Sequence, residues 1–150
     1  MNKIKEKIQR NELLISVRTN LLNQEALKLK DIRSVKIDLV NRLKTFQKQY
    51  LDGVDLLNNE RQSSQRQRLA TLEASIDRSK DQWYQCLSEL KEVEEKEKKQ
   101  INMVLDARTK LRSIEIMQEK EEQNLANLKR KIEQKEQDEL AGQSFSRRQR

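Results

Sequence analysis

The chain has 150 residues, of which 38% are charged and 34% hydrophobic, and its formal net charge at pH 7 is +7. It contains no proline, two glycines and 3% aromatic residues. This composition is too polar to fill a globular core, whereas it suits long helices that carry a narrow apolar stripe. The regular spacing of the apolar residues also argues against a disordered chain.

Several classes of chemistry lack the residues that they need. The chain has no histidine, the side chain on which metal sites and general bases at neutral pH most often rely. Its two glycines, Gly53 and Gly142, stand far apart, so there is no glycine-rich phosphate loop. Carboxylates on an exposed helical surface stay solvated and cannot form acid–base pairs. The sequence therefore predicts a protein that is not an enzyme and that uses no metal or cofactor.

The compartment follows from the cysteine content and the hydropathy. Cys86 is the only cysteine, which excludes an internal disulfide and favours a reducing compartment. Its place beside an apolar row predicts a buried, inert thiol more readily than a reactive one. No apolar run approaches the roughly 20 residues that cross a bilayer, and the amino terminus is charged and periodic, unlike a secretory signal. We expect a cytoplasmic protein without membrane insertion.

Apolar residues recur every seven positions in the first part of the chain, as they do along the seam of a coiled coil. The first row holds Ile8, Ile15, Leu22, Leu29, Leu43, Tyr50 and Leu57, and a second row holds Ile32, Leu39 and Phe46. These rows predict a helix over about residues 3–57. The second row is polar at Asn11, Arg18 and Glu25, so the amino-terminal half of the seam is the less complete one.

The pattern changes phase across Asn58–Arg68, a segment without any aliphatic or aromatic residue. Two offset seams predict two helices joined by a turn at about residues 58–65, with the seams facing each other. Folding the chain about residue 61 places Phe46 opposite Ile76. A one-residue skip within a single continuous helix would produce the same phase shift and is the alternative.

A second helix is expected over about residues 66–141. Its seam holds Leu69, Leu72, Ile76, Trp83, Leu90, Val93, Val104, Leu111, Ile114, Leu125, Leu128 and Ile132. Ser64 and Gln67 have the spacing of a capping box, and Gly142 is a natural stop. Residues 142–150 are expected to form a disordered basic tail. The predicted fold is all-α, a single domain over residues 1–150, formed by a long two-helix antiparallel coiled-coil hairpin.

The positive charge does not point to nucleic acid. Acidic and basic residues interleave along both helices, whereas phosphate binding favours a one-sided basic stripe. Three of the positive charges are Arg147, Arg148 and Arg150, at the end of the chain. This arginine tail is either a solubilising end or an electrostatic docking arm.

Three segments resemble a known family in their order and in their distance from the turn. They are LKTFQKQYLDGVDLL (43–57), RLATLEASIDRSKDQWYQ (68–85) and KIEQKEQDELAGQSFSRRQR (131–150). Together with the length and the basic charge, they are similar to the flagellar export protein FliJ, from about residue 43 to the end. The amino-terminal third matches that family only in its periodicity.

The resemblance implies a non-enzymatic central stalk of the flagellar type III export apparatus, at the base of the bacterial flagellum. Its partners would be the hexameric export ATPase, whose ring assembly it promotes, the cytoplasmic part of the export-gate membrane protein, and the export chaperones. Such a protein is cytoplasmic and peripherally associated with the inner membrane.

The resemblance also implies two sites. The gate-binding positions of the family correspond here to Leu43, Phe46, Tyr50, Leu72, Ser75 and Ser79. Ser75 and Ser79 differ in side chain from the family pattern, and Leu39 and Arg68 also depart from it. The charged ends of both helices suit the polar pore of a ring, which assigns pore binding to Lys3, Lys5, Lys7, Arg10, Lys129, Arg130, Lys131, Arg147 and Arg148.

Other readings of the sequence stay open. The equivalent stalk of a virulence-type secretion system shares the architecture with little sequence identity. A generic coiled-coil tether would form a parallel dimer and would have no ATPase partner. For Leu43, Phe46 and Tyr50, the heptad positions also fit a purely structural role in the seam between the helices.

Overall fold

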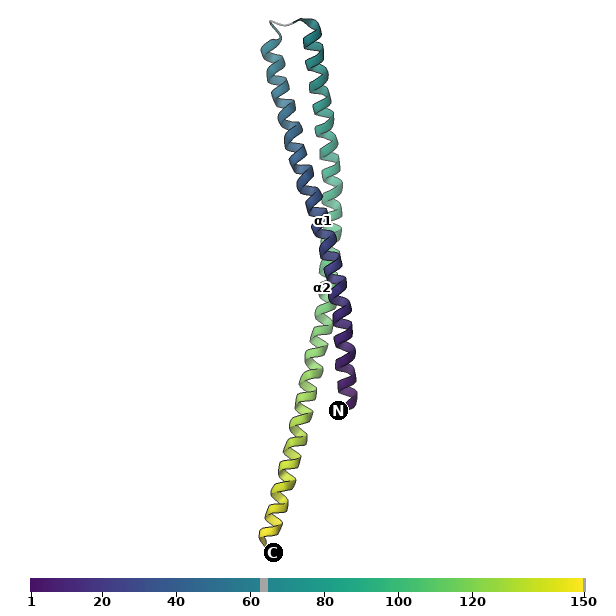
Figure 1. Ribbon diagram of the computed structural model, residues 1–150, viewed down its shortest axis with the longest axis vertical. Coiled ribbons are helices and arrows are strands. Elements are labelled where there is room, and N and C mark those ends of the chain that lie inside the picture. Colours follow the sequence, from purple (N-terminus) through teal and green to yellow (C-terminus); the bar gives the residue numbers. More distant parts are fainter. Residues whose placement is uncertain (63–64, 150) are drawn as a thin grey trace. The chain divides into compact units, whose positions relative to one another are not determined.

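The computed structural model describes residues 1–62 and 65–149. Two α-helices make up nearly all of this part of the chain, α1 (Asn2–Glu60) and α2 (Arg66–Gln149), and they pack against each other (Figure 1). No strand is present among the described residues. The predicted all-α fold of two long paired helices is thereby confirmed. Neither described helix has a stretch long and apolar enough to cross a lipid bilayer.

The helix ends next to the connection differ slightly from the expected ones. α1 continues to Glu60, and the N–H of Arg61 still donates to the carbonyl of Leu57 at 3.0 Å. α2 begins at Arg66, and the carbonyl of Gln65 accepts from the N–H groups of Arg68 and Leu69. Residues 58–60 of the expected turn are therefore helical. Ser64, the expected capping residue, lies outside the described residues.

The carboxyl-terminal end of α2 departs from the expectation of a stop at Gly142. The helix runs through this glycine to Gln149, so residues 142–149 are helical rather than an irregular tail. A stop would use the left-handed conformation that glycine permits, but no glycine of the chain has a positive φ. A glycine inside a helix costs only about 1 kcal/mol relative to alanine, and no proline follows to break the helix.

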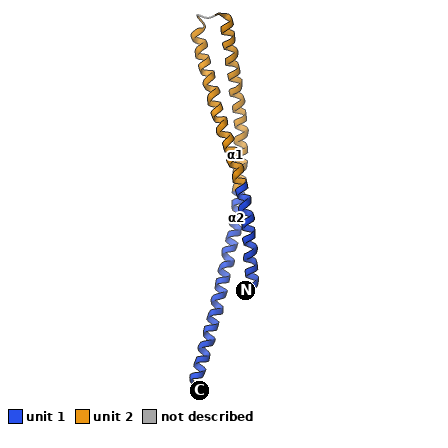
Figure 2. Cartoon of the chain, in the orientation of Figure 1, with its two compact units in different colours: residues 1–24, 105–150 blue, residues 25–104 orange. Residues whose placement is uncertain are grey.

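The chain divides into two compact units (Figure 2). One unit, called here the connection unit, comprises Glu25–Val104, and the other, called the terminal unit, comprises Met1–Gln24 with Leu105–Arg150. Each unit pairs a segment of α1 with a segment of α2. In the connection unit the most buried apolar side chains are Leu39, Leu57, Ile76, Cys86 and Val104, all on the predicted seams or, for Cys86, beside one.

The relative register of the helices differs from the expected one. Gly53, not Phe46, faces Ile76: a Cβ atom built on Gly53 would lie 2.9 Å from Cγ1 of Ile76. Phe46 instead lines a groove with Gln82 and Cys86. Gly53 follows Phe46 by seven residues, so one helix has slid by a heptad relative to the expected pairing. A slide of one heptad keeps both seams facing each other, which is why periodicity could not exclude it.

Candidate functional site

The residues expected to bind an export gate all lie in the connection unit, on both helices. Leu43, Phe46, Tyr50 and Leu72 are half-buried, Ser79 is buried and Ser75 is exposed. Half-buried seam residues of a two-helix pair keep one flank accessible from the side. Leu43, Phe46, Tyr50 and Leu72 therefore pack between the helices and still present part of their surface. Ser79 offers almost none of its surface to a partner.

Aromatic rings gather at this level of the connection unit. The rings of Tyr50 and Trp83 lie 5.7 Å apart, from opposite helices. The ring of Tyr84 stacks on Trp83 with the same centroid separation, and the ammonium of Lys80 lies 5.7 Å from the centre of the Tyr84 ring. Tyr84 is exposed, as its position off the seam predicts. The contact with Trp83 favours this position of the Tyr50 ring, because aromatic pairs of this kind add about 0.5–1.5 kcal/mol beyond the area they bury.

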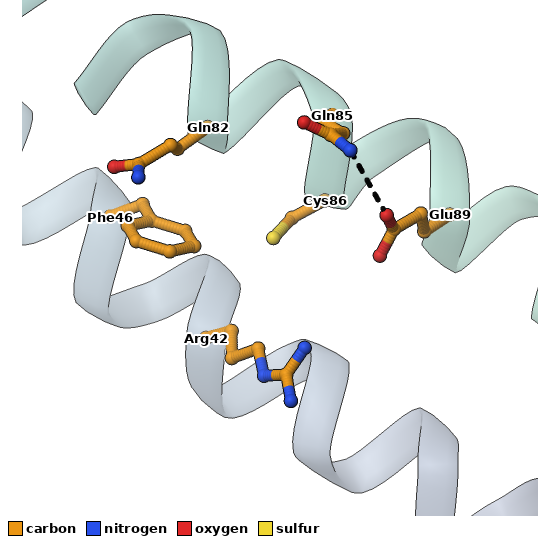
Figure 3. Close-up of a pocket in the computed structure, with 6 residues that line it drawn as sticks. All are labelled: Arg42, Phe46, Gln82, Gln85, Cys86 and Glu89. Atoms are coloured by element: carbon orange, nitrogen blue, oxygen red, sulfur yellow. Dashed lines mark hydrogen bonds between the residues drawn. The ribbon is translucent and has the colours of Figure 1, made fainter. Parts of the chain in front are cut away.

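An open groove of about 370 Å³ runs beside Phe46 (Figure 3). α1 contributes Arg42 and Phe46, and α2 contributes Gln82, Gln85, Cys86 and Glu89. The Gln85 amide donates to Glu89 Oε1 at 3.4 Å, so both side chains line the rim on one helix. The thiol of Cys86 is buried beneath this rim, as predicted. The lining of the groove thus combines one aromatic ring, that of Phe46, with polar and charged side chains from both helices.

Polar residues interrupt the seam farther along the connection unit, and the structure pairs them across the two helices. The Gln100 amide donates to the backbone carbonyl of Glu25 at 2.9 Å and to Glu25 Oε2 at 2.6 Å. The bond from Gln100 to the carboxylate lowers the pKa of Glu25; partial burial opposes this shift, and the nearby Lys28 adds to it. A hydrogen bond to the charged form favours that form.

A second polar contact lies one turn away in sequence on α2. Lys36 Nζ is 3.2 Å from Glu97 Oε1, and Arg33 Nε is 3.8 Å from Glu97 Oε2. Glu97 and Gln100 occupy seam positions of α2, and the expected fold about residue 61 would have set Glu25 opposite Glu97. The observed register replaces that like-charge pair with an amide contact and two ion pairs.

The terminal unit contains a buried polar pair that has no counterpart among these expected sites. Asn11 and Gln118 occupy seam positions, each with 7% of its surface exposed. The Gln118 amide donates to the carbonyl of Ile8 at 3.3 Å, whereas Gln118 Oε1 is buried with no hydrogen-bond partner among the described residues. Both polar residues sit on heptad positions, which is the sequence signal for such a pair.

The basic residues expected to bind an ATPase pore all lie in the terminal unit. All nine side chains are exposed, as is every residue from 129 to 148. Arg147 follows Lys131 by sixteen residues on one helix, which is about 24 Å at a rise of 1.5 Å per residue. The structure therefore separates the final arginines from the cluster Lys129, Arg130 and Lys131, which lies just past the paired part of α2.

No described residues form a cluster of three or more His, Cys, Asp or Glu side chains able to hold a metal ion. Comparisons with protein-family models, curated proteins and solved structures return no match for this chain. The support for its candidate sites therefore comes from their geometry and from the sequence resemblance given above.

Proposed function

We propose that the chain is a non-enzymatic stalk protein that couples a ring-shaped ATPase to another component of a type III export apparatus, as in the flagellar family that it resembles. The observation that supports this most is the unequal length of the two paired helices. α2 has 84 residues and α1 has 59, and residues 129–148 of α2 are exposed without a partner helix. An unpaired helix of this kind is free to enter a ring.

The charge of the terminal unit supports a ring partner. Lys3, Lys5, Lys7 and Arg10 on α1 are exposed, and Lys129, Arg130 and Lys131 follow the paired region of α2. Cations on an exposed surface attract an acidic pore by long-range electrostatics, an attraction that salt weakens. In this proposal the terminal unit binds the hexameric export ATPase and promotes assembly of its ring.

The connection unit is the proposed contact for the gate. The partly accessible Phe46 and Tyr50, with the polar-rimmed groove beside Phe46, offer an aromatic anchor with hydrogen-bonding groups around it. Aromatic anchors dominate many protein interfaces. Ser79 is too buried to contribute directly, so its assignment depends on the resemblance alone. Export chaperones, and a peripheral place at the inner membrane, belong to the same proposal and also derive from the resemblance.

The alternatives differ in their partners. A virulence-type stalk would have the same architecture and a different ATPase. A generic tether would use its seam to form a parallel dimer. The seams of both helices are occupied within one chain, which supports a monomer.

Stimulation of the ATPase tests the proposal. Purified chain added to the flagellar export ATPase is expected to raise its hydrolysis rate and its hexamer fraction. The triple variant Lys129→Glu, Arg130→Glu, Lys131→Glu is expected to lose most of that effect. A matched triple variant in the connection unit, Lys44→Glu, Lys48→Glu, Arg78→Glu, changes the same number of exposed charges and is expected to stimulate normally. Equal stimulation by both triple variants would count against the pore assignment, and stimulation of a virulence-type ATPase alone would select that alternative.

A further inference from the structure

The terminal unit carries an exposed apolar row that the helix pair leaves uncovered. Leu14, Val17 and Leu21 on α1 have 42%, 48% and 40% of their surface exposed, and Met117 on α2 has 57%. None of these residues belongs to the seam, where Ile15, Leu22 and Gln118 are the buried or half-buried neighbours.

The heptad positions put these four side chains on one side of the unit. Leu14 and Leu21 each precede an a position of α1, and Met117 precedes the a position Gln118 of α2, so all three occupy g positions. In an antiparallel pair, the g positions of the two helices face each other across the same edge of the seam. The connection unit shows this geometry directly, since Arg42, Gln82 and Glu89, all g residues, line one groove (Figure 3). Val17, at a c position, extends the row outward along α1.

The charges on this side are of one sign. Its c and g positions from residue 3 to 21 and from 106 to 131 hold one acid, Asp106, which is paired with Lys110 at 3.0 Å. The cations at those positions are Lys3, Lys7, Arg10, Lys110, Lys120 and Lys131. Apart from Lys110, none of them makes an ion pair with another described residue. The apolar row is thus enclosed by unpaired positive charge.

The opposite side of the same unit provides an internal comparison. Its b and e positions carry four cations, Lys5, Arg108, Arg112 and Lys129, and four acids, Glu12, Glu115, Glu119 and Glu122. Arg112 there bonds to both Glu115 and Glu119 at 3.2 Å, and these contacts raise the pKa of its guanidinium. The cationic excess is therefore a property of one side and does not extend around the terminal unit.

We propose that this side, the apolar–basic face formed by Leu14, Val17, Leu21 and Met117 with their surrounding lysines and Arg10, is a docking surface for an acidic amphipathic helix of another protein. A groove between two helices accepts a third helix whose apolar residues recur at heptad spacing. Acidic residues flanking that apolar stripe would meet the lysines on both helices. Exposed apolar patches with a polar rim commonly mark such sites.

Two other occupants fit the face less well. A second copy of the chain would bring the same unpaired cations together, and like charges in an interface oppose association. An anionic membrane would match the charge, but the apolar row has no tryptophan or phenylalanine, and such rings are typical of helices that lie in the membrane interface. The face shares Lys3, Lys7, Arg10 and Lys131 with the residues proposed to bind the ATPase ring, but the binary contact with an acidic helix is tested without that ATPase.

Binding of a designed peptide to the full-length chain tests the proposal. The probe is a fluorescently labelled helical peptide of three heptads, with leucine at its a and d positions and glutamate at its e and g positions. We expect it to bind in fluorescence anisotropy, and a peptide with lysine in place of glutamate to bind at least about tenfold more weakly. The variant Leu14→Ser, Val17→Ser is expected to weaken binding of the acidic peptide by about tenfold or more. Leu105→Ser, which removes an exposed leucine on the opposite side, is expected to leave the affinity within about twofold.

A charge-reversed variant keeps the test independent of folding defects. Lys7→Glu, Lys120→Glu lowers the net charge of the c and g positions of this face from +5 to +1 and is expected to remove most of the preference for the acidic peptide over the lysine peptide. Equal binding of the acidic peptide to the wild type and to Leu14→Ser, Val17→Ser would overturn the proposal. So would failure of the acidic peptide together with binding to phosphatidylserine-containing vesicles, which would identify a membrane surface. If light scattering shows that the wild type is a dimer and that Leu14→Ser, Val17→Ser dissociates it, the face would instead be assigned to a second copy of the chain.

Discussion

Of the two glycines, Gly53 lies closer to the partner helix: a Cβ atom placed on Gly53 would stand only 2.9 Å from Cγ1 of Ile76. Phe46 would occupy the same position if the helices were paired one heptad differently. Ile76 faces a glycine in the observed register and would face a phenylalanine in the other one. The two registers therefore differ in how well their side chains pack. The Gly53–Ile76 contact therefore helps to select the observed pairing.

Substitution of Gly53 by alanine tests this contact. Alanine normally stabilises a helix interior by about 1 kcal/mol relative to glycine. Here the new methyl group meets the branched side chain of Ile76, and overpacking typically costs about 1–3 kcal/mol. We expect Gly53→Ala to lower the free energy of unfolding by up to about 2 kcal/mol, the difference between these two effects. Denaturant unfolding followed by the fluorescence of Trp83, in the same unit, measures it.

Gly142 provides the matched control, because nothing lies within 4 Å of a Cβ built there. Gly142→Ala is expected to raise the helical content of the carboxyl-terminal part of α2, as seen by circular dichroism, without lowering stability.

A double variant tests the Gly53–Ile76 contact itself. Ile76→Ala combined with Gly53→Ala should destabilise the chain by less than the sum of the two single changes. A Gly53→Ala protein more stable than wild type would show that Ile76 moves aside freely.

The buried pair Asn11 and Gln118 predicts a substitution that stabilises the chain. A buried amide oxygen without a partner forfeits its hydration, and replacing both polar partners with apolar groups of similar size can be stabilising. We expect Asn11→Leu, Gln118→Leu to raise the free energy of unfolding by about 1–3 kcal/mol. Thermal unfolding by circular dichroism measures the change. A lower melting temperature for the double variant would mean that the amides contribute more than their contacts indicate.

The Glu25–Gln100 contact predicts a pH dependence. The pKa of Glu25 is lowered from its ordinary value of 4.5 in the folded chain, chiefly by the Gln100 hydrogen bond. The contact therefore stabilises the folded state at pH values above the unfolded pKa, and this contribution is lost as the pH falls through the folded pKa. Below about pH 4.5 we expect stability to fall, and the variant Glu25→Gln to lose that component of the decline.

Titration of Glu25 by carboxyl-selective NMR tests the cause directly. In Gln100→Ala the pKa of Glu25 is expected to rise toward its ordinary value, because the largest lowering contribution has gone. Gln85→Ala removes an amide that bonds to Glu89 within α2 and is the control, expected to leave the Glu25 titration unchanged. An unchanged Glu25 pKa in Gln100→Ala would assign the shift to another group.

Much of the fold was predictable because heptad spacing depends only on local sequence. The seam residues within the paired part of the helices and the buried Cys86 follow from that spacing, whereas the start of α2 near residue 66 was expected from the capping-box spacing of Ser64 and Gln67. The predicted register of the two helices was wrong by seven residues. The hydrophobic pattern could not reveal this, because a slide of one heptad leaves Leu39, Phe46 and the other seam residues facing inward. What distinguishes the registers is side-chain size at single positions such as Gly53, which a hydrophobic pattern does not record. The prediction that the second helix ends at Gly142 was wrong, because a glycine permits a helix to end but does not require it.

The candidate sites were less predictable than the fold. The gate positions other than the exposed Ser75 lie on the seam, as the pattern predicts, and Ser79, seven residues after Leu72 on the same row, faces the partner helix in either register. The apolar–basic face was missed because Leu14 and Leu21 directly precede the seam residues Ile15 and Leu22, so the hydrophobic pattern does not separate them from the seam. Only the exposure of these side chains, and the antiparallel pairing that sets Met117 on the same side, reveals a separate surface.

The native Cys86 permits the most direct measurement of the central structural claim, the antiparallel pairing in this register. Arg42 and Phe46 both border Cys86, so Leu43 between them is placed to face it. In Leu43→Cys, mild oxidation or a short bismaleimide is expected to join residue 43 to Cys86 within one chain, seen by mass spectrometry as linked tryptic peptides. Lys36→Cys, which would face Cys86 in the pairing slid by a heptad, is expected to cross-link poorly. Efficient linkage from position 36 and none from position 43, or linkage only between separate chains, would contradict the account.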